Sequence, residues 1–426
     1  MNVLVLGSGG REHALAWRLQ QGPKGRKVVC APGNPGIAQD VETTTFDILD
    51  PAQVVEAAKT QGADLVIIGP EAPLVAGVAD ALLEADIPVF GPSQWAAQLE
   101  SSKSFAKKIF NDNKIPTARG ETFTTAKEAL NYLDDLGFNC VIKADGLAAG
   151  KGVILCDTQE DAIIAIDRIM TRREFGDAGA KIVIEEKLAG EEVSVFALTD
   201  GERILMLPTA QDHKRVFDDD EGPNTGGMGA YGPAPVLDNK SLKKVVEKIL
   251  EPTVKAMARG GHPYRGVLYA GLMVTEDGPK ILEYNCRFGD PECQVLMMLL
   301  DEDLAPLLHA CATGKVEPGR APKLYKGAAA CVVMASGGYP DKFKKSLAIT
   351  GIPAGEPDLK VFHAGTAIKD GRLVTNGGRV LGVTARGADL REALKTAYNA
   401  CGQITWDGVH YRKDIGRKGL KRLGLI

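Results

Sequence analysis

The stretch that decides the fold is Ile281-Leu-Glu-Tyr-Asn-Cys-Arg-Phe-Gly-Asp-Pro-Glu292, which begins as a strand and ends in a turn. An apolar, alternating run, 266–274, precedes it, and turn residues separate the two, so the pair is predicted to form a β-hairpin. Side chains two positions apart on a strand share one face. We therefore expect Glu283, Asn285 and Arg287 to point into the same small volume.

That trio combines a carboxylate, an amide oxygen and a fixed guanidinium fork. Mg²⁺ binds oxygen ligands, usually one or two from protein and the rest from water and phosphate, which makes Glu283 and Asn285 candidate metal ligands. Arg287 is a candidate anion-binding residue because its fork matches phosphate geometry. The alternative is a half-buried strand whose polar face is merely solvated, and this motif alone does not separate the two.

The chain opens with a pattern that is typical of nucleotide-binding folds. Residues 2–6 are a short apolar strand, residues 7–13 a glycine-rich turn, and residues 14–20 the helix that follows. The amides of Gly9 and Gly10 at the start of this helix are candidate donors to one phosphate group. A simple tight turn is the alternative.

A dinucleotide site is disfavoured at this turn. It needs a third glycine where Glu12 stands, and an acidic residue at the end of the second strand, where 28–32 has none. Further strands at 63–69 and 87–91 alternate with helical patterns, which predicts a parallel sheet. Glu71 follows one of them and is a candidate ligand contact, because open α/β sheets bind ligands at the carboxyl ends of their strands.

Two lysines and a glycine-rich connection mark the centre of the chain. Lys103 stands at the start of a helix that serines cap, and Lys143 lies in a strand predicted at 141–145. Residues 146–152 connect that strand to the next and carry Lys151 at the tip. Their spacing does not match a Walker loop, but their amides and Lys151 are suited to fold over phosphates. A surface hairpin without a role is the alternative.

Three polar stretches follow. The segment 180–195 pairs an apolar strand with acids around a glycine, and 209–215 carries charges of both signs. The segment 222–231 is expected to be an irregular, glycine-rich loop that serves a site. The acidic run 218–221 before it is expected to face solvent rather than to bind metal.

The end of the chain, 326–426, is predicted to form a separate unit. One helix is expected from Glu292 to about Thr313, followed by a proline-containing connector and then by strands and a helix that make an α+β domain without a catalytic constellation. We expect three domains: a Rossmann-like one at 1–101, a central one at 102–325 with a mobile lid subdomain at about 117–190, and the α+β domain at 326–426.

The composition excludes several classes of function. The chain has 426 residues, 44% of them hydrophobic, and its net charge of −4 comes from 51 basic and 55 acidic residues without large blocks. This gives no electrostatic footprint for nucleic acid or membrane, so small-molecule substrates are expected. No basic leader or bilayer-length apolar segment occurs, and the eight cysteines form no Cys-x-x-Cys pair, so a cytoplasmic protein with reduced cysteines is expected.

Six stretches, in order, resemble the glycinamide ribonucleotide synthetase family of the ATP-grasp superfamily. They are GSGGREHALAW (7–17), GPEAPLV (69–75), KADGLAAGKGV (143–153), AQDHKRV (210–216), GPNTGGMGAY (222–231) and EYNCRFGDPE (283–292). The stretches VFHAGT (361–366), TNGGRVL (375–381) and HYRKDIG (410–416) extend the likeness almost to the C-terminus. The resemblance implies a multidomain protein of α/β and α+β class, with an ATP-grasp fold between the Rossmann-like domain and the α+β domain.

The resemblance also implies an ATP site with a divalent metal, Mg²⁺ or Mn²⁺. Glu283 and Asn285 would hold the metal, and the glycine-rich flap would close over the phosphates. Many ATP-grasp enzymes add a carboxylate from the preceding strand, but here that stretch, 269–274, has none. The implied ATP-binding residues, with 185–188 receiving adenine and the last one the ribose, are Lys103, Lys143, Gly146, Gly150, Gly152, Glu185, Glu186, Leu188 and Glu192.

The remaining site residues are likewise implied by the resemblance. Lys143, Arg287 and Lys151 would be catalytic, because they would stabilise charge on the transferring phosphoryl group or close the flap over it. The residues near the sugar phosphate and glycine would be Gly9, Gly10, Glu71, Asp212, Lys214, Asn224, Thr225 and Arg287.

The implied activity is ATP-dependent ligation of glycine to 5-phosphoribosylamine, which gives glycinamide ribonucleotide, ADP and phosphate through glycyl phosphate in purine biosynthesis. A monomer without nucleic-acid or membrane partners is expected. The rivals are another ATP-grasp carboxylate–amine ligase or carboxylase, an NAD-dependent dehydrogenase, and a nucleotide-binding sensor without catalysis. Release of ADP that requires both glycine and phosphoribosylamine separates these alternatives.

Overall fold

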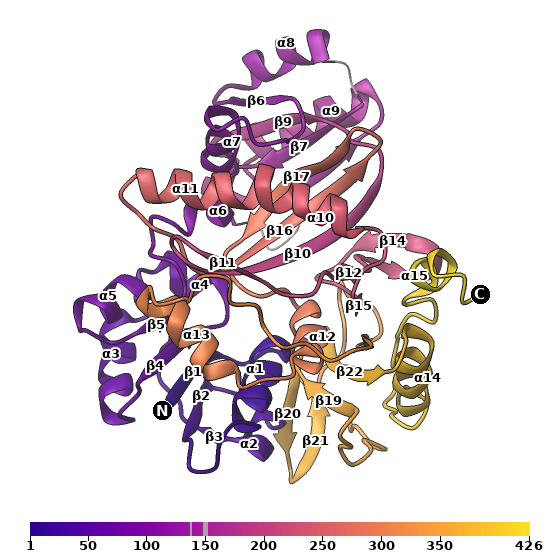
Figure 1. Ribbon diagram of the computed structural model, residues 1–426. Helices are drawn as coiled ribbons and strands as arrows, with labels where there is room; N and C mark the ends of the chain where they lie inside the picture. The colour runs from indigo at the N-terminus through magenta and orange to yellow at the C-terminus, as the bar shows by residue number, and fades with distance from the viewer. Residues whose placement is uncertain (137–138, 148–151) are drawn as a thin grey trace.

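A computed structural model describes residues 1–136, 139–147 and 152–426 (Figure 1). A parallel sheet forms the N-terminal part, an antiparallel sheet with a small α/β unit above it forms the centre, and the C-terminal part packs beside them. Within these ranges, no helix is both long and apolar enough to cross a membrane. Gly150 and Lys151, which are expected to belong to the flap, lie outside the described residues.

The N-terminal sheet has five parallel strands in the order β3-β2-β1-β4-β5. Its central strands are short apolar runs buried on both faces, as a parallel sheet requires. This order confirms the predicted Rossmann-like domain. The elements are β1 (Val3–Gly7), α1 (Gly10–Gln20), β2 (Val28–Pro32), α2 (Ile37–Asp40), β3 (Glu42–Thr43), α3 (Pro51–Thr60), β4 (Leu65–Ile68), α4 (Glu71–Val75), α5 (Val78–Glu84) and β5 (Val89–Phe90).

Helix α1 begins at Gly10, four residues before the predicted start, so the glycine-rich turn is shorter than expected. Glu12 is the reason, because its Oε2 accepts a hydrogen bond from the Gly9 amide at 2.6 Å and caps the helix. Its buried side chain also fills the space at the carboxyl edge of the sheet: a Cβ at Gly7 or Gly69 would lie 2.4 Å or 2.3 Å from Glu12 atoms. This filling agrees with the prediction against a dinucleotide at the turn.

The central sheet is antiparallel, in the order β11-β10-β16-β17. Its β16 and β17 form the hairpin that carries Glu283 and Asn285. Its last two strands pair around a tight turn as predicted, but β17 ends before Arg287. Helices α10 and α11 cross this sheet in Figure 1 and contribute apolar side chains to the core beneath them. The elements are α6 (Gln98–Ser101), α7 (Lys103–Asp112), β10 (Glu191–Asp200), β11 (Ile204–Met206), α10 (Asn239–Val245), η4 (Val246–Leu250), α11 (Glu251–Arg259), β16 (Arg265–Thr275) and β17 (Gly278–Asn285).

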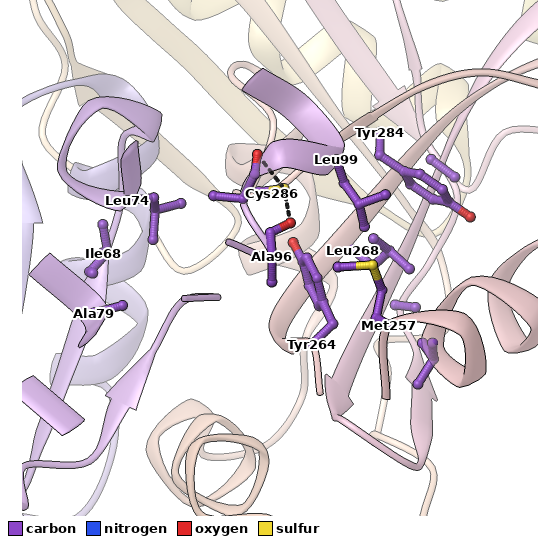
Figure 2. Close-up of a cluster of buried hydrophobic side chains, with 14 of the residues drawn as sticks. Ile68, Leu74, Ala79, Ala96, Leu99, Met257, Tyr264, Leu268, Tyr284 and Cys286 are labelled. Atoms are coloured by element: carbon purple, nitrogen blue, oxygen red, sulfur yellow. Dashed lines mark hydrogen bonds between the residues drawn. The ribbon is translucent and has the colours of Figure 1, made fainter. Parts of the chain in front are cut away.

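One face of the end of β17 is fixed in the core (Figure 2). Tyr284 and Cys286 are buried there among apolar side chains from several elements, and the Cys286 amide donates to Glu100 Oε2 at 2.7 Å. Because neighbouring side chains on a strand point to opposite faces, this anchoring turns Glu283 and Asn285 away from the core. The core therefore orients the candidate metal ligands.

A small unit with its own core stands above the central sheet in Figure 1. Its strands have the order β6-β9-β7-β8, and helices α8 and α9 pack against them. This unit contains most of the segment expected to be a lid, and that role stays a prediction. The elements are β6 (Gly120–Phe123), α8 (Ala126–Leu136), β7 (Cys140–Ala144), β8 (Val153–Cys156), α9 (Gln159–Ile166), η1 (Asp167–Thr171), η2 (Gly176–Ala180) and β9 (Ile182–Glu186).

A third sheet, in the order β12-β15-β18-β22-β19, joins two distant parts of the chain. The segment 222–231, expected to be irregular, contains most of β14 and most of β15, and Gly229–Gly232 is buried against β18. The sheet crosses the expected domain boundary at 325/326, and the boundaries stay predictions. The elements are β12 (Gln211–Asp212), β13 (Arg215–Phe217), η3 (Asp218–Asp220), β14 (Glu221–Asn224), β15 (Gly229–Gly232), β18 (Ala328–Ala335), β19 (Leu359–His363), β20 (Thr366–Lys369), β21 (Arg372–Thr375), β22 (Arg379–Gly387), α14 (Leu390–Cys401) and α15 (Arg417–Arg422).

The single helix predicted after Glu292 is wrong, because two helices occur there: α12 (Glu292–Leu299) and α13 (Leu304–Thr313). Between them Leu300 is extended and forms a bridge with Leu324. Asp303 then caps α13 by accepting from the Ala305 amide at 3.2 Å. The strand-like pairing of Leu300 and the cap at Asp303 therefore separate the two helices.

Candidate active site

The polar face of the central hairpin forms the centre of the candidate site. Glu283 and Asn285 lie two positions apart on β17, and both are half-buried. Gly271 of β16 is the register partner of Glu283, and a Cβ there would lie 3.6 Å from Glu283 Cγ. The neighbouring strand therefore places no second carboxylate beside Glu283.

Lys103 meets Glu283 from the start of helix α7. Its Nζ lies 3.0 Å from Glu283 Oε2, and the Ser102 hydroxyl caps the first turn of this helix. Lys103 lowers the pKa of Glu283 to about 2, against the opposing effect of burial, and Lys214 and Lys143 add to the lowering. Glu283 is therefore a charged carboxylate among cations at any physiological pH.

Lys143 is held in place by Glu185. Its Nζ lies 2.6 Å from Glu185 Oε2 and donates to the Leu282 carbonyl at 3.0 Å, while Lys107 lies 2.8 Å from Glu185 Oε1. Burial raises the pKa of Glu185, but the two lysines outweigh it and hold that pKa below its usual value. In this geometry Glu185 positions Lys143 beside β17, and its predicted contact with adenine stays a prediction.

The other residues predicted to bind adenine and ribose lie between the last residue of β9 and the start of β10. Glu186 Oε1 accepts from the Arg119 amide at 2.9 Å, and Leu188 is half-buried just beyond the strand. Glu192 forms an ion pair with Lys214. The structure thus brings a predicted ribose-binding residue against a predicted substrate-binding residue, although the nucleotide contacts themselves stay predictions.

Arg287 lies between two carboxylates rather than on the strand face of Glu283. Its Nη2 is 3.1 Å from Glu100 Oε1, and its Nε is 3.4 Å from Glu71 Oε2. This buried Nε donates no hydrogen bond within the described parts of the chain. The structure therefore brings Glu71 and Arg287 together, as the predicted substrate site requires.

Asp212 is a carboxyl group that titrates near neutrality. Burial raises the pKa of Asp212 to about 7; Lys214 opposes this effect, and Glu292 and Glu192 add to it. The Tyr269 hydroxyl donates to buried Glu292 at 2.7 Å, which keeps this second acid in place. A group with such a pKa is suited to exchange a proton during a reaction.

Asn224 and Thr225 stand in the segment that joins β14 to β15. Asn224 is exposed and is the register partner of Arg215. The Thr225 hydroxyl donates to the Lys214 carbonyl at 2.9 Å. Thr225 therefore fixes this segment against a predicted substrate residue, whereas Asn224 lies on an exposed hairpin.

The turn at the start of α1 contacts the segment that follows β17. The Gly9 amide is engaged by Glu12, and Arg11 is buried and donates to the Phe288 carbonyl at 3.1 Å. A phosphate contact from Gly9 and Gly10 stays a prediction. The cation that the structure places beside this turn is Arg11.

The described ends of the glycine-rich flap are closely packed. The Gly152 carbonyl accepts from the Ala144 amide at 2.8 Å, which extends the pairing of β7 with β8. A Cβ at Gly146 would lie 2.7 Å from Ala178 Cβ, so only glycine fits at that end.

Three residues that position the site are absent from the sequence predictions: Asp145, Glu100 and Lys107. Asp145 accepts from the Ser104 hydroxyl at 2.6 Å, which ties the end of β7 to the start of α7. These residues stand 41, 186 and 78 positions from Ser104, Cys286 and Glu185, which they contact. No local pattern in the sequence marks such long-range partners, because the residues that meet are far apart along the chain.

The oxygen donors of Glu283 and Asn285 fit a divalent metal ion that takes further ligands from bound phosphate. Among the described residues, no group of three or more His, Cys, Asp or Glu side chains is arranged to hold a metal. One carboxylate and one amide oxygen suit Mg²⁺, which usually takes its other ligands from water and substrate phosphates. The surrounding lysines favour those phosphates.

A Rossmann-like sheet joined to a central antiparallel sheet, with a small unit above it and lysines directed at one hairpin, is the architecture of the ATP-grasp class of ATP-binding proteins. Within that class, the chain belongs to the phosphoribosylglycinamide synthetase family. The N domain of that family matches residues 1–100, its ATP-grasp (A) domain residues 101–293, and its C domain residues 329–418.

Individual relatives match along the whole chain. The phosphoribosylamine–glycine ligase of Rhodopirellula baltica is 52% identical over 427 residues, covering 98% of each chain. The protein of the same name from Rhizobium meliloti is 51% identical over 422 residues, covering 99% of each. The crystal structure of phosphoribosylamine–glycine ligase from Thermotoga maritima matches with a TM-score of 0.86 at 36% identity, covering 97% of this chain and 100% of that one.

Proposed function

We propose that the chain ligates glycine to 5-phosphoribosylamine with ATP, giving glycinamide ribonucleotide, ADP and phosphate in purine biosynthesis. The observation that carries this proposal is the full-length similarity to phosphoribosylamine–glycine ligases, at 52% identity over 98% of each chain. The site geometry supports it, because Lys103 and Lys143 contact the hairpin that carries Glu283, and Arg287 follows that hairpin.

The glycine carboxylate is a poor acylating agent, so it must first be activated. One of its oxygens attacks the γ-phosphorus of ATP, the bond to the bridging oxygen breaks, and ADP leaves. The amine of phosphoribosylamine then attacks the carbonyl carbon of glycyl phosphate, and inorganic phosphate leaves. The amine loses one proton in this step, and Asp212, whose pKa is about 7, is proposed to accept it.

The site residues stabilise the negative charge that moves in these steps. Lys103 and Lys143 are proposed to bind the ATP phosphates, and Arg287 the oxygens of the transferring phosphoryl group. Glu283 and Asn285 would hold Mg²⁺ or Mn²⁺, which supplies further neutralisation of phosphate charge when bound. Closure of the lid over an intermediate that hydrolyses readily, with Lys151 and Gly150 in the flap, remains part of this proposal.

Steady-state assays of ADP release test the proposed reaction. Release is expected to require glycine, phosphoribosylamine and a divalent metal together. Release with ammonia in place of the sugar amine, or with bicarbonate in place of glycine, would identify another ATP-grasp ligase or carboxylase. Binding of ATP without ADP release would indicate a sensor.

Isotope transfer tests the intermediate. Glycine labelled with ¹⁸O in its carboxylate is expected to pass one labelled oxygen to inorganic phosphate, because the attacking oxygen stays on phosphorus when the amide forms. Mass spectrometry of the phosphate measures this transfer. Label in AMP, with pyrophosphate as the other product, would show an adenylate instead.

The surroundings and assembly of the protein are part of the same proposal. All eight cysteines are buried and unpaired, which supports a reducing compartment such as the cytoplasm. We propose a monomer, for which light scattering is expected to give a mass near 45.3 kDa. A mass of twice that value at micromolar concentration would exclude the monomer.

A further inference from the structure

Arg379, at the start of β22, connects the C-terminal part of the chain to the candidate site. Its Nη1 donates to the carbonyl oxygens of Gly226 and Gly227, at 2.5 Å and 3.4 Å, and also to the Asp290 carbonyl. Its Nη2 lies 3.2 Å from Asp290 Oδ2. One guanidinium therefore joins the Gly226–Gly227 turn to the segment that follows the central hairpin, β16–β17.

The Gly226–Gly227 turn packs closely against the Arg379 guanidinium. A Cβ at Gly226 would lie 3.1 Å from the central carbon of the Arg379 guanidinium, so the glycine lets the planar group lie against the backbone. The Gly226 amide donates to the Tyr339 hydroxyl at 3.0 Å, which is a second contact from the C-terminal part. A Cβ at Gly227 would lie 2.6 Å from Pro291 Cδ. The turn is thus packed from two sides.

Asp290 lies where three parts of the chain meet. Its Oδ1 accepts from Gln294 Nε2 at 2.7 Å, and its Oδ2 faces Arg379. A Cβ at Gly9 or Gly10 would lie 3.6 Å from its carboxylate oxygens, so the N-terminal turn is its direct neighbour. Each oxygen of a carboxylate accepts two hydrogen bonds, which leaves Asp290 capacity for a ligand.

The charges around Asp290 suit a phosphorylated sugar. Burial raises the pKa of Asp290, but Arg379, Arg11 and Arg287 outweigh it and keep the carboxylate ionised. A carboxylate accepts hydrogen bonds from sugar hydroxyls, and arginines bind phosphate. This combination matches a sugar phosphate better than a simple amine such as ammonia.

We propose, on the basis of the proposed function, that Arg379 is a positioning residue for the acceptor amine. It fixes Asp290 and the Gly226–Gly227 turn as one surface, and Asp290 binds hydroxyl groups of the phosphorylated sugar there. The C-terminal domain then completes the acceptor end of the site, whereas the ATP end is complete without it.

Binding of the product tests this role without turnover. Glycinamide ribonucleotide and ADP are titrated separately into wild type and Arg379→Ala by calorimetry. We expect Arg379→Ala to weaken glycinamide ribonucleotide about tenfold or more, because Asp290 and the turn lose their common anchor, while ADP affinity stays within about twofold. In turnover, the KM for phosphoribosylamine is expected to rise while the KM for ATP does not.

Arg386→Ala is the matched control. Arg386 lies near the other end of the same strand with similar exposure, and its Nε pairs with Asp358 at 2.7 Å. It is expected to bind both ligands like wild type. Equal affinity for glycinamide ribonucleotide in wild type, Arg379→Ala and Arg386→Ala would overturn the role of Arg379. A wild-type chain that does not bind this product would instead refute the proposed function.

Two milder variants keep the proposal testable if Arg379→Ala does not fold. Arg379→Lys retains the positive charge but has a single nitrogen, so it cannot contact the carbonyl oxygens and Asp290 Oδ2 at the same time, and it should weaken glycinamide ribonucleotide less than alanine does. Tyr339→Phe removes the second contact to the turn and should shift affinity in the same direction. An unchanged affinity in both variants would count against the proposal.

The proposed contact of Asp290 with a sugar hydroxyl is tested by changing the sugar of the ligand. Wild type is expected to prefer glycinamide ribonucleotide over its 2-deoxyribose counterpart, and Asp290→Asn to lose most of that preference. An unchanged preference in Asp290→Asn would remove the hydroxyl contact from the proposal.

Discussion

At the scale of single residues, the cations of the candidate site lie against carboxylates. Lys103 meets Glu283 at 3.0 Å, Lys143 meets Glu185 at 2.6 Å, and Lys214 pairs with Glu192. Removing one member of such a half-buried pair leaves the other without its partner. Changes that preserve size but alter charge therefore give the clearest tests.

Glu283→Gln is expected to lower kcat/KM about 100-fold or more and to raise the metal concentration needed for half-maximal activity, because it removes the charged member of the proposed metal pair. Metal titrations with Mg²⁺ and Mn²⁺ measure both effects. Glu276→Gln, at the exposed turn of the same hairpin, is the control and should behave like wild type. An unchanged metal requirement in Glu283→Gln would reject the metal role.

Asp212→Asn is expected to change both the pH profile and the stability. Since the folded state raises the pKa of Asp212 to about 7, its stabilising effect is complete below the unfolded pKa near 4 and disappears as pH rises through 7. The asparagine variant should therefore gain stability over wild type at pH 8, by at most about 4 kcal/mol, and the gain should shrink toward pH 4.

Denaturant unfolding at several pH values measures this difference. The same variant should lose the rise in kcat/KM between about pH 6 and 8, if Asp212 accepts the proton of the amine. A pH-independent difference in stability between the two proteins would show that Asp212 does not titrate in this range.

At the scale of elements, Asp145 joins β7 to α7. It accepts from the Ser104 amide at 3.0 Å and from the Ser102 hydroxyl at 3.0 Å, so the strand with Lys143 and the helix with Lys103 are held at a fixed spacing. This contact lies between the small upper unit and the central sheet. The spacing of the two lysines is thus set by one long-range contact.

Asp145→Ala is expected to raise the KM for ATP about tenfold while leaving the KM for glycine nearly unchanged, because only the phosphate-binding lysines lose their relative placement. Initial-rate kinetics with each substrate varied in turn measure the effect. Glu174→Ala, which removes an exposed partner of Arg168 in the same unit, is the matched control. Equal changes in both constants would indicate general destabilisation.

At the scale of the whole molecule, the C-terminal segment 412–418 forms ion pairs with the acidic run 218–220. Asp218 and Asp219 are exposed as predicted, whereas Asp220 is half-buried. The run also pairs with the basic residues Arg412, Arg417 and Lys418. Arg412 is only 1% exposed and also pairs with Asp414 at 2.7 Å. The run therefore connects the segment before β14 and β15 to the end of the chain.

Arg412→Met is expected to lower the free energy of unfolding by about 3 kcal/mol, because it leaves two acids without their buried partner. Burial raises the pKa of Asp414, but Arg412 outweighs it and the pKa lies below its usual value, so this contribution is present above the unfolded pKa near 4 and is lost as pH falls below it. Arg417→Met, at a half-exposed pair, should cost less than about 1 kcal/mol.

Unfolding in urea at pH 7 and at pH 3 measures these differences. The loss caused by Arg412→Met should be smaller at pH 3 than at pH 7. Losses of similar size for Arg412→Met and Arg417→Met would contradict the buried pairing.

The sequence by itself determined the parallel N-terminal sheet, the central hairpin and the alternation that places Glu283 beside Asn285, because these depend on neighbours a few positions apart. The tertiary structure alone decided that Arg287 leaves the strand face and lies between Glu71 and Glu100, and that the single helix after Glu292 breaks in two. It alone brought Arg379 to Asp290 and to Gly226, which stand 89 and 153 positions away. Those contacts depend on how sheets pack against one another, and packing between distant segments leaves no period in the local sequence.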